Sequence, residues 1–348
     1  MLELADRYLE GRDVRRDPVE AAHLAVLAGA PGEAWLAGRA ERGDAYALLL
    51  LADARAKAQR DASEVDGRRA LAQLRAQAAQ GDAWAVYELG VAYEAGWVVD
   101  KDLQQARAHY ERAAEQDLAS AQLALGRALS EGRGGPEDTA LAFGWLAKAA
   151  RQRHPAAQLL VASMHESGQG TPRDLAAAFS QARASAQQGW PAAQLYLGWS
   201  YLTGKLTPAD PKLAEQWLLR AARQHLPLAQ GVLGKVYETG EGLRRDEPAA
   251  AHWYRKAAQA GDASSQANLA AMYLEGRGVP RDDAAGARWL AQAAAQGHAT
   301  AQYDLGSLYE QGRGVPRDLA NAATWYGKAA AQGHDAARES LRSLEQRR

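Results

Sequence analysis

The stretch YEQGRGVPRDLANAATWYGKAAAQGH, from Tyr309 to His334, decides the fold because the chain carries it three times in succession. The chain reads YLEGRGVPRDDAAGARWLAQAAAQGH from Tyr273 and YETGEGLRRDEPAAAHWYRKAAQAGD from Tyr237, so the copies are 36 residues apart (309−273 and 273−237). A fixed period of this length is typical of architectures in which one supersecondary unit stacks on the next. We therefore expect a repeat protein.

The loop GRGVPRD within this stretch has the glycines and basic residues of a phosphate-binding loop. A phosphate loop of the GxxxxGK[ST] type needs a lysine and a hydroxyl at the helix start, and a dinucleotide loop needs GxGxxG after a strand. Neither pattern is present. We interpret these loops as connectors between helices.

Four residue types recur at the 36-residue spacing over most of the chain. The glycine and aspartate columns are unbroken: Gly96, Gly132, Gly168, Gly204, Gly240, Gly276 and Gly312; Asp102, Asp138, Asp174, Asp210, Asp246, Asp282 and Asp318. An alanine column is equally regular: Ala114, Ala150, Ala186, Ala222, Ala258, Ala294 and Ala330. Tryptophan fills five of seven positions in its column, with two exceptions: Trp145, Trp217, Trp253, Trp289 and Trp325; His109 and Gln181.

These columns predict two helices per repeat. The segment before each column glycine has apolar residues at helical spacing, and we expect this first helix, A, to end at the glycine, which adopts a positive φ without steric cost. The aspartate is expected to accept backbone N–H groups at the start of a second helix, B. On helix B, the column alanines allow close helix approach, and the tryptophan is expected to fill the wedge between layers.

Composition excludes several classes of protein. The chain has 348 residues with 47% hydrophobic side chains, enough for a stable core, and a formal net charge of −1 gives no overall attraction to nucleic acid. The absence of cysteine removes disulfides, thiol catalysis and cysteine-ligated zinc. We find no apolar run of the eighteen or more residues that would indicate a membrane-spanning helix.

The repeat unit resembles that of the Sel-one-like repeat (SLR) family, a relative of the tetratricopeptide repeats. The pattern A-x-x-x-L-G-x-x-Y-x-x-G-x-G-V-x-x-D-x-x-x-A-x-x-W-Y-x-K-A-A-x-Q-G is matched almost letter for letter from Ala301 to Gly333. The resemblance implies an all-α fold, an α/α solenoid in which antiparallel helix pairs form a right-handed superhelix. It also implies a protein that binds other proteins in a concave groove and has no catalytic centre.

The register of the repeats predicts one continuous solenoid in three parts. Residues 1–80 are expected to form degenerate N-terminal repeats with insertions, residues 81–334 seven repeats in register, and residues 335–348 a C-terminal capping helix. The copy at Leu4–Ala22 begins inside a helix A, so the first repeat is incomplete. We expect a cytoplasmic protein if Met1 is the native start, and a periplasmic one if a signal sequence has been removed.

Candidate binding residues are those that break the columns with large or charged side chains. They are Trp84, Trp97, Trp190, Tyr196, Trp199 and Lys235. Trp199 stands in a helix A column that is otherwise mostly small or polar, and Tyr196 lies one turn before it on the same face. Exposed aromatic residues are enriched at interaction hot spots. The alternative is that these rings pack locally to compensate for a weak neighbouring repeat, in which His165 and Gln181 replace the usual tyrosine and tryptophan.

Three functions follow from the resemblance and these residues. The first is a non-catalytic scaffold that holds a partner protein. The second, narrower, is an immunity protein that neutralises a secreted antibacterial effector, such as a phospholipase-type effector of the type VI system. The third is a hydrolytic enzyme, which the sequence does not favour because we find no catalytic motif. We expect no cofactor, since the histidines His154, His298 and His334 are a repeat or more apart, about 10 Å per layer, too far to share a metal.

Overall fold

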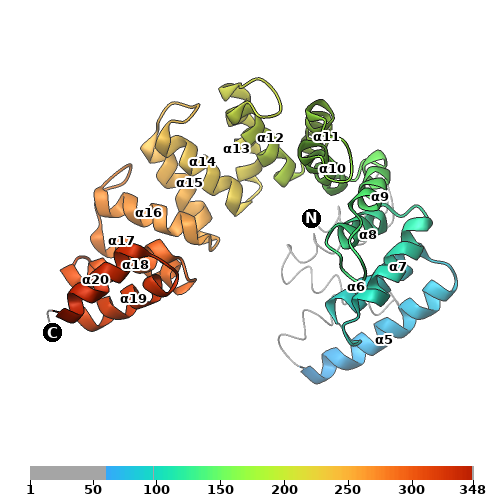
Figure 1. The fold of residues 1–348 in the computed structure, drawn as a ribbon, viewed down its shortest axis with the longest axis horizontal. Coiled ribbons are helices and arrows are strands. Elements are labelled where there is room, and N and C mark those ends of the chain that lie inside the picture. The colour runs from blue at the N-terminus through green and yellow to red at the C-terminus, as the bar shows by residue number, and fades with distance from the viewer. Residues whose placement is uncertain (1–59, 97, 347–348) are drawn as a thin grey trace. The chain divides into compact units, whose positions relative to one another are not determined.

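The computed structural model describes residues 60–96 and 98–346, and this part of the chain contains helices and no strand (Figure 1). The all-α fold predicted from the repeats is thereby confirmed. The copy at Leu4–Ala22 and the candidate residue Trp97 lie outside the described residues.

The helices form a regular succession along the chain. Their bounds are α5 Arg60–Ala79, α6 Ala83–Ala95, α7 Leu103–Glu115, α8 Ala119–Ser130, α9 Thr139–Arg151, α10 Pro155–Ser167, α11 Leu175–Gln187, α12 Pro191–Thr203, α13 Pro211–Arg223, α14 Pro227–Thr239, α15 Glu247–Gln259, α16 Ala263–Glu275, α17 Asp283–Ala295, α18 Ala299–Gln311, α19 Leu319–Ala331 and α20 Asp335–Gln346. From α6 to α19, the even-numbered helices are the predicted A helices and the odd-numbered ones the B helices.

The described residues form two compact units. The first ends at Ala157 and includes the loop Gly168–Pro172, and the second comprises Gln158–Ser167 and everything from Arg173 onward. In the second unit, each A helix from α12 to α18 packs along the B helix that follows it, and each of these B helices packs on the next helix in the chain. This is the packing of an α/α solenoid.

The glycine and aspartate columns end and begin the helices as predicted. Gly240, for example, follows α14 in the left-handed conformation with φ 73°, and its N–H donates to the Val236 carbonyl. Asp246 precedes α15 and accepts the Ala249 N–H at 2.9 Å. All seven column aspartates cap a B helix in this way: Asp102, Asp138, Asp174, Asp210, Asp246, Asp282 and Asp318.

The tightest contact within a repeat involves the residue after the tryptophan column. Tyr254 is fully buried, and its ring lies so close to the backbone of Gly234 on α14 that a Cβ there would stand 2.6 Å from its Cδ1. The same position is buried in every described repeat: Tyr110, Leu146, Ala182, Leu218, Tyr254, Leu290 and Tyr326. The core of each helix pair is therefore built on this column.

The tryptophans themselves lie farther out than predicted. Trp253 is buried, with 8% of its surface exposed, but the other four are only half-buried. A lysine or arginine one turn later covers the ring of most of them, as Lys328 does at 4.1 Å from the Trp325 centroid. They still pack between successive layers, since Trp253 joins the core formed by Leu218 of the preceding repeat and Leu233 of its own repeat. The tryptophans therefore do pack between layers as predicted, but the fully buried residue is the one that follows the tryptophan, such as Tyr254 after Trp253.

A row of buried glutamines ties successive B helices through the A helix between them. Gln266 on α16 donates to the Ala258 carbonyl at 3.1 Å, and its Oε1 accepts from Gln296 at 2.8 Å. Equivalent glutamine pairs are Gln122 with Gln152, Gln158 with Gln188, Gln194 with Gln224, and Gln302 with Gln332. In residues 227–262, Ala260 takes the place of the second glutamine, and the Oε1 of Gln230 is buried with no hydrogen bond among the described residues.

Replacing Ala260 with glutamine is expected to raise the free energy of unfolding by about 1 kcal/mol, the usual net value of one buried hydrogen bond. The backbone suits the change, because Ala260 has φ −81°, close to the −79° of Gln296 at the equivalent place. Denaturant unfolding measures the effect, and Gln296→Ala as the matched control should lose a similar amount. An Ala260→Gln variant no more stable than the parent contradicts the glutamine row as a stabilising element.

The C-terminal helix α20 packs on α19. Leu344 is buried with Tyr326 and Ala337, and Leu341 packs against the same cluster. The predicted amphipathic helix is present, with its apolar side on the last repeat. None of the helices in the described part of the chain is both long and apolar enough to cross a bilayer.

Candidate protein-binding surface

Trp199 is the large aromatic side chain that the A helices leave most open to solvent. It lies in the third turn of α12 with 44% of its surface exposed. The equivalent positions on the other described A helices hold Val91, Arg127, Ser163, Lys235, Ala271 and Ser307. The fold therefore does not require a large apolar residue at this position, and folding does not explain why an exposed tryptophan is found there.

Leu228, in the first turn of α14, is exposed even further, at 61%. Tyr196 of α12 contacts Glu166 of the preceding A helix, α10. One repeat later in the sequence, the equivalent residues are Val232 of α14 and Leu202 of α12. We therefore expect Val232 and Leu202 to face each other. Both pack against the same core cluster. One helical turn earlier on each helix are Leu228 and Trp199. We infer that they lie side by side across the two helices.

This pairing of two large apolar residues is peculiar to one place in the described repeats. Elsewhere the equivalent pairs contain a small or polar residue: Val91 with Ser120, Arg127 with Ala156, Ser163 with Ala192, Lys235 with Ser264, and Ala271 with Thr300. The other exposed large hydrophobic residues, Leu141 and Leu319, are isolated at the starts of B helices. We call Trp199 and Leu228 the apolar patch.

Tyr196, predicted to join Trp199 in binding, has a partner inside the protein. Its hydroxyl donates to the Glu166 carboxylate, which also pairs with Lys205. Burial raises the pKa of the Tyr196 hydroxyl, and the bond to Glu166 adds to the effect. Three other repeats have a glutamate at the position of Glu166, and there the tyrosine that donates to it comes from helix B of the same repeat. In the repeat of Glu166, the position of that tyrosine holds Ala182. Tyr196 thus supplies the hydroxyl that Ala182 cannot provide.

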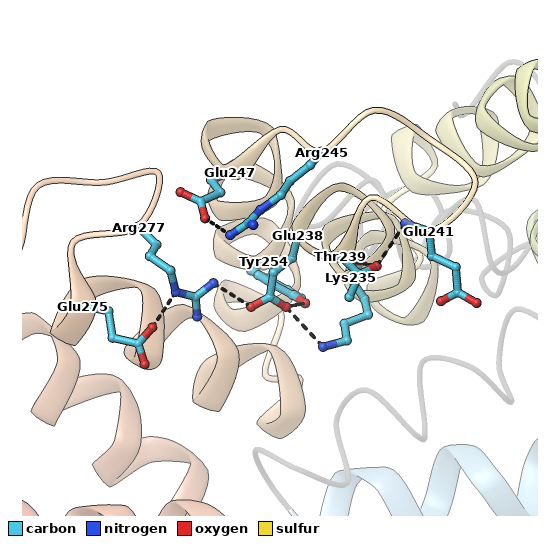
Figure 2. A network of polar contacts seen from close by, with 9 residues as sticks. All are labelled: Lys235, Glu238, Thr239, Glu241, Arg245, Glu247, Tyr254, Glu275 and Arg277. Carbon is cyan, nitrogen blue, oxygen red and sulfur yellow. Dashed lines mark hydrogen bonds and ion pairs between the residues drawn. The ribbon is translucent and has the colours of Figure 1, made fainter.

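Lys235, the charged candidate, belongs to a polar network around Glu238 (Figure 2). Lys235 and Arg277 approach the Glu238 carboxylate at 3.3 Å and 3.0 Å, and the Tyr254 hydroxyl donates to it at 2.8 Å. Burial alone raises the pKa of the Glu238 carboxyl, but the bonds from Tyr254, Arg277 and Lys235 outweigh it, so the pKa is lowered. Glu238 therefore stays ionised at neutral pH, with Lys235 exposed at the rim.

The other predicted residues lie in different environments. Trp190 is half-buried against Ala193 and Leu197 at the start of α12, and so contributes to the core. Trp84 is half-buried near the start of α6, where its ring meets Tyr87 edge-on at 5.8 Å. The structure thus gives Trp190, Tyr196 and Trp199 three separate surroundings, and only Trp199 combines a large ring with high exposure.

Leu228 was missed by sequence reasoning. Its column holds Trp84, Ser120, Ala156, Ala192, Leu228, Ser264 and Thr300, so the departure was visible, but leucine is an ordinary core residue. Only the exposed fraction marks it as unusual.

The described residues offer little for catalysis. No group of three or more His, Asp or Glu side chains in this part of the chain is arranged to hold a metal ion. An open polar depression of about 980 Å³ lies before α15, lined by residues that include Glu215, Tyr237 and Arg245. Tyr237 donates to Glu215 at 2.5 Å, and Arg245 pairs with Glu247. These groups satisfy one another, which suits a structural network better than an acid–base pair.

Helix pairs that pack in succession define an α/α solenoid. The Sel1 repeat matches the chain eight times, at residues 1–30, 85–118, 119–154, 155–189, 191–226, 227–262, 263–298 and 299–334, so the chain belongs to the Sel1 repeat family. Proteins of this family are generally non-catalytic scaffolds for protein interactions.

Two solved Sel1-type structures agree with this assignment, and the chain is also similar to an immunity protein. A Sel1 repeat protein from Oxalobacter formigenes is 32% identical, with a TM-score of 0.65 and 93% of each chain covered. A protective antigen of uropathogenic Escherichia coli with an SLR fold is 27% identical, with a TM-score of 0.53, 100% of this chain and 87% of that chain covered. An immunity protein from Pseudomonas aeruginosa is 21% identical, with a TM-score of 0.43, 63% of this chain and 82% of that chain covered. No curated protein matches the chain.

Proposed function

We propose that this protein is a non-catalytic scaffold that binds a partner protein through the apolar patch on α12 and α14. The observation that carries the proposal is the exposure of Trp199 and Leu228, at positions where most other repeats have small or polar residues. Family membership supports protein binding as the general role.

The patch has the physical properties of a binding anchor. A tryptophan and a leucine that become buried together would remove a large apolar area from water, at about 25 cal/mol per Å². Both stand on packed helices whose core neighbours Leu197 and Leu233 are fully buried, so little ordering is required on binding. Polar or charged neighbours such as Thr203 and Lys235 provide a rim of the kind that surrounds interaction hot spots.

Replacing both Trp199 and Leu228 with alanine is expected to weaken partner binding by at least about 2 kcal/mol, which is the hot-spot scale. The intact chain serves as bait in the source cell, captured proteins are identified by mass spectrometry, and a stoichiometric partner should be lost with the double variant. The matched control is Leu141→Ala with Leu319→Ala, which also removes two exposed apolar side chains, and this variant should retain the partner.

A partner retained equally by all three chains would overturn the patch as the binding site. The double variant is preferred to one at Tyr196, because Tyr196 bonds to Glu166 and its removal would disturb folding as well as binding.

A narrower role belongs to the same proposal. If the partner is a secreted antibacterial effector, the protein is an immunity protein that blocks it. The family resemblance, and no individual residue, motivates this version, and the identity of the captured partner decides it. A hydrolytic function has less support, because Tyr237, Glu215 and Glu238 are engaged in internal hydrogen bonds.

A further inference from the structure

The apolar patch spans the junction between two repeats, residues 191–226 with Trp199 and residues 227–262 with Leu228. The second unit contains three other junctions of the same kind, one before and two after this one. Comparison of the four shows that this junction lacks one polar tie that its neighbours have, and that the repeat after it lacks a second tie, between its own two helices.

The first tie joins the loop after an A helix to the A helix of the preceding repeat. Lys205 pairs with Glu166, and Arg277 pairs with Glu238 at 3.0 Å, each 39 residues apart in sequence. Arg313, at the position equivalent to Arg277, donates hydrogen bonds to the Leu274 carbonyl and to the Asp283 carboxylate. At the patch junction, Glu241 stands in place of the lysine or arginine and Leu202 in place of the glutamate. Because leucine carries no charge, no ion pair can form between these two positions.

The second tie is the glutamine pair. It joins the A helix to the end of the B helix within one repeat, and it is present in the repeats before and after residues 227–262, where Gln224 donates to Gln194 and Gln296 donates to Gln266, each at 2.8 Å. Gln224 also donates to the Gly189 carbonyl of the preceding repeat, again at 2.8 Å. With Ala260 in the corresponding place, no such bonds form within residues 227–262, the repeat that follows the patch junction.

The contacts that remain there are mostly apolar. Gln230 still donates to the Ala222 carbonyl and Tyr237 to Glu215, but both bonds lead to helix B of the preceding repeat. Between α12 and α14 themselves, Leu195, Leu202 and Val232 pack around Leu233 and Val236. Apolar packing is non-directional, so it resists separation of the helices more than a small rotation or slide.

We propose that this junction is a hinge within the second unit, at which α12 and α14 change their relative angle. The missing ion pair would join the loop after α14 to α12, so its absence loosens the junction itself. The missing glutamine bond would join α15 to α14, so its absence loosens the repeat beside the junction. If the patch is the binding site, as the proposed function states, the hinge would let Trp199 and Leu228 adjust to the partner's surface.

The hinge is tested by distances between spin labels, which the absence of cysteine makes straightforward. Gln216, His252, Arg288 and Thr324 occupy the same exposed position on successive B helices. Labels on Gln216→Cys and Arg288→Cys form the first pair, which spans the patch junction and the junction after it. Labels on His252→Cys and Thr324→Cys form the second pair, which spans the two junctions after the patch junction, both of which have the first tie. Double electron–electron resonance should give a distance distribution about 1.5-fold wider or more for the first pair, as expected across a hinge.

Restoring the ties should remove the difference. In a Leu202→Glu, Glu241→Arg, Ala260→Gln background, the distribution for the first pair is expected to narrow to the width of the second, while the second pair is unchanged. Equal widths in the parent chain, or no narrowing in the restored chain, would overturn the hinge. Because no partner is added, this result is independent of whether the apolar patch binds a protein.

Discussion

Replacing Tyr254 with alanine is expected to lower the free energy of unfolding by about 3–5 kcal/mol, the cost of truncating a large aromatic core residue. The ring is completely buried among Ala250, Leu269 and Met272, and lies against the Gly234 backbone. Backbone on one side and packed side chains on the others leave little room for collapse, so a cavity would remain. The change also removes the hydroxyl that donates to Glu238 at 2.8 Å.

Tyr254→Phe separates the two contributions. It keeps the ring and removes only the hydrogen bond. We expect a loss of at most about 1.5–3 kcal/mol, the value of a hydrogen bond to a charged group, because Arg277 and Lys235 still hold Glu238. Denaturant unfolding, with hydrogen exchange to locate the loss around α14–α16, measures both variants. A Tyr254→Ala variant no less stable than Tyr254→Phe would show that the ring is not a core element.

Replacing Gly278 with alanine is expected to cost about 3–4 kcal/mol, because backbone strain and steric clash act together at this position. Gly278 has φ +66°, and a Cβ there would stand 2.3 Å from the Glu247 carbonyl oxygen at the start of α15. The obstructing atoms belong to the backbone and cannot rotate away. The same restriction applies at Gly134, Gly170 and Gly314, where an added Cβ would stand about 2 Å from a carbonyl oxygen of the preceding repeat. The second glycine of the G-x-G loop is therefore a packing requirement between repeats.

Gly261→Ala is the matched control. Gly261 also has a positive φ, +93°, but a Cβ there would meet no atom within 4 Å. We expect only backbone strain, about 1–2 kcal/mol. Thermal and denaturant unfolding of the two variants would distinguish clash from strain. Equal losses would mean that the contact with Glu247 is not restrictive.

The regular features of the fold followed from the sequence because each depends on local chemistry. The positive φ of Gly240 and the capping by Asp246 are properties of a helix end and need no knowledge of neighbouring repeats. The position of Trp253 relative to Tyr254 was harder, since both are large aromatics one residue apart. Which of them reaches full burial depends on the rotation of helix B against helix A, which spacing alone does not specify.

The candidate site was only partly predictable for a similar reason. Trp199 was found because a tryptophan in a polar column is conspicuous, whereas Leu228 required its measured exposure. Tyr196 was assigned to binding because it lies one turn before Trp199, and its bond to Glu166 of the preceding repeat could not be seen in the sequence. One signal was available in the sequence and passed unused: Glu94, Glu166, Glu238 and Glu310 recur every 72 residues (166−94, 238−166 and 310−238). This period of two repeats marks the network that contains Lys235.

The most direct test of protein binding at the apolar patch is the calorimetric affinity of the captured partner for three chains. These are the parent, Trp199→Ala with Leu228→Ala, and Leu141→Ala with Leu319→Ala, all checked for unchanged unfolding curves. We predict a dissociation constant raised by at least about 30-fold for the patch variant and unchanged for the control. Equal affinity for all three chains would contradict the patch as the binding site.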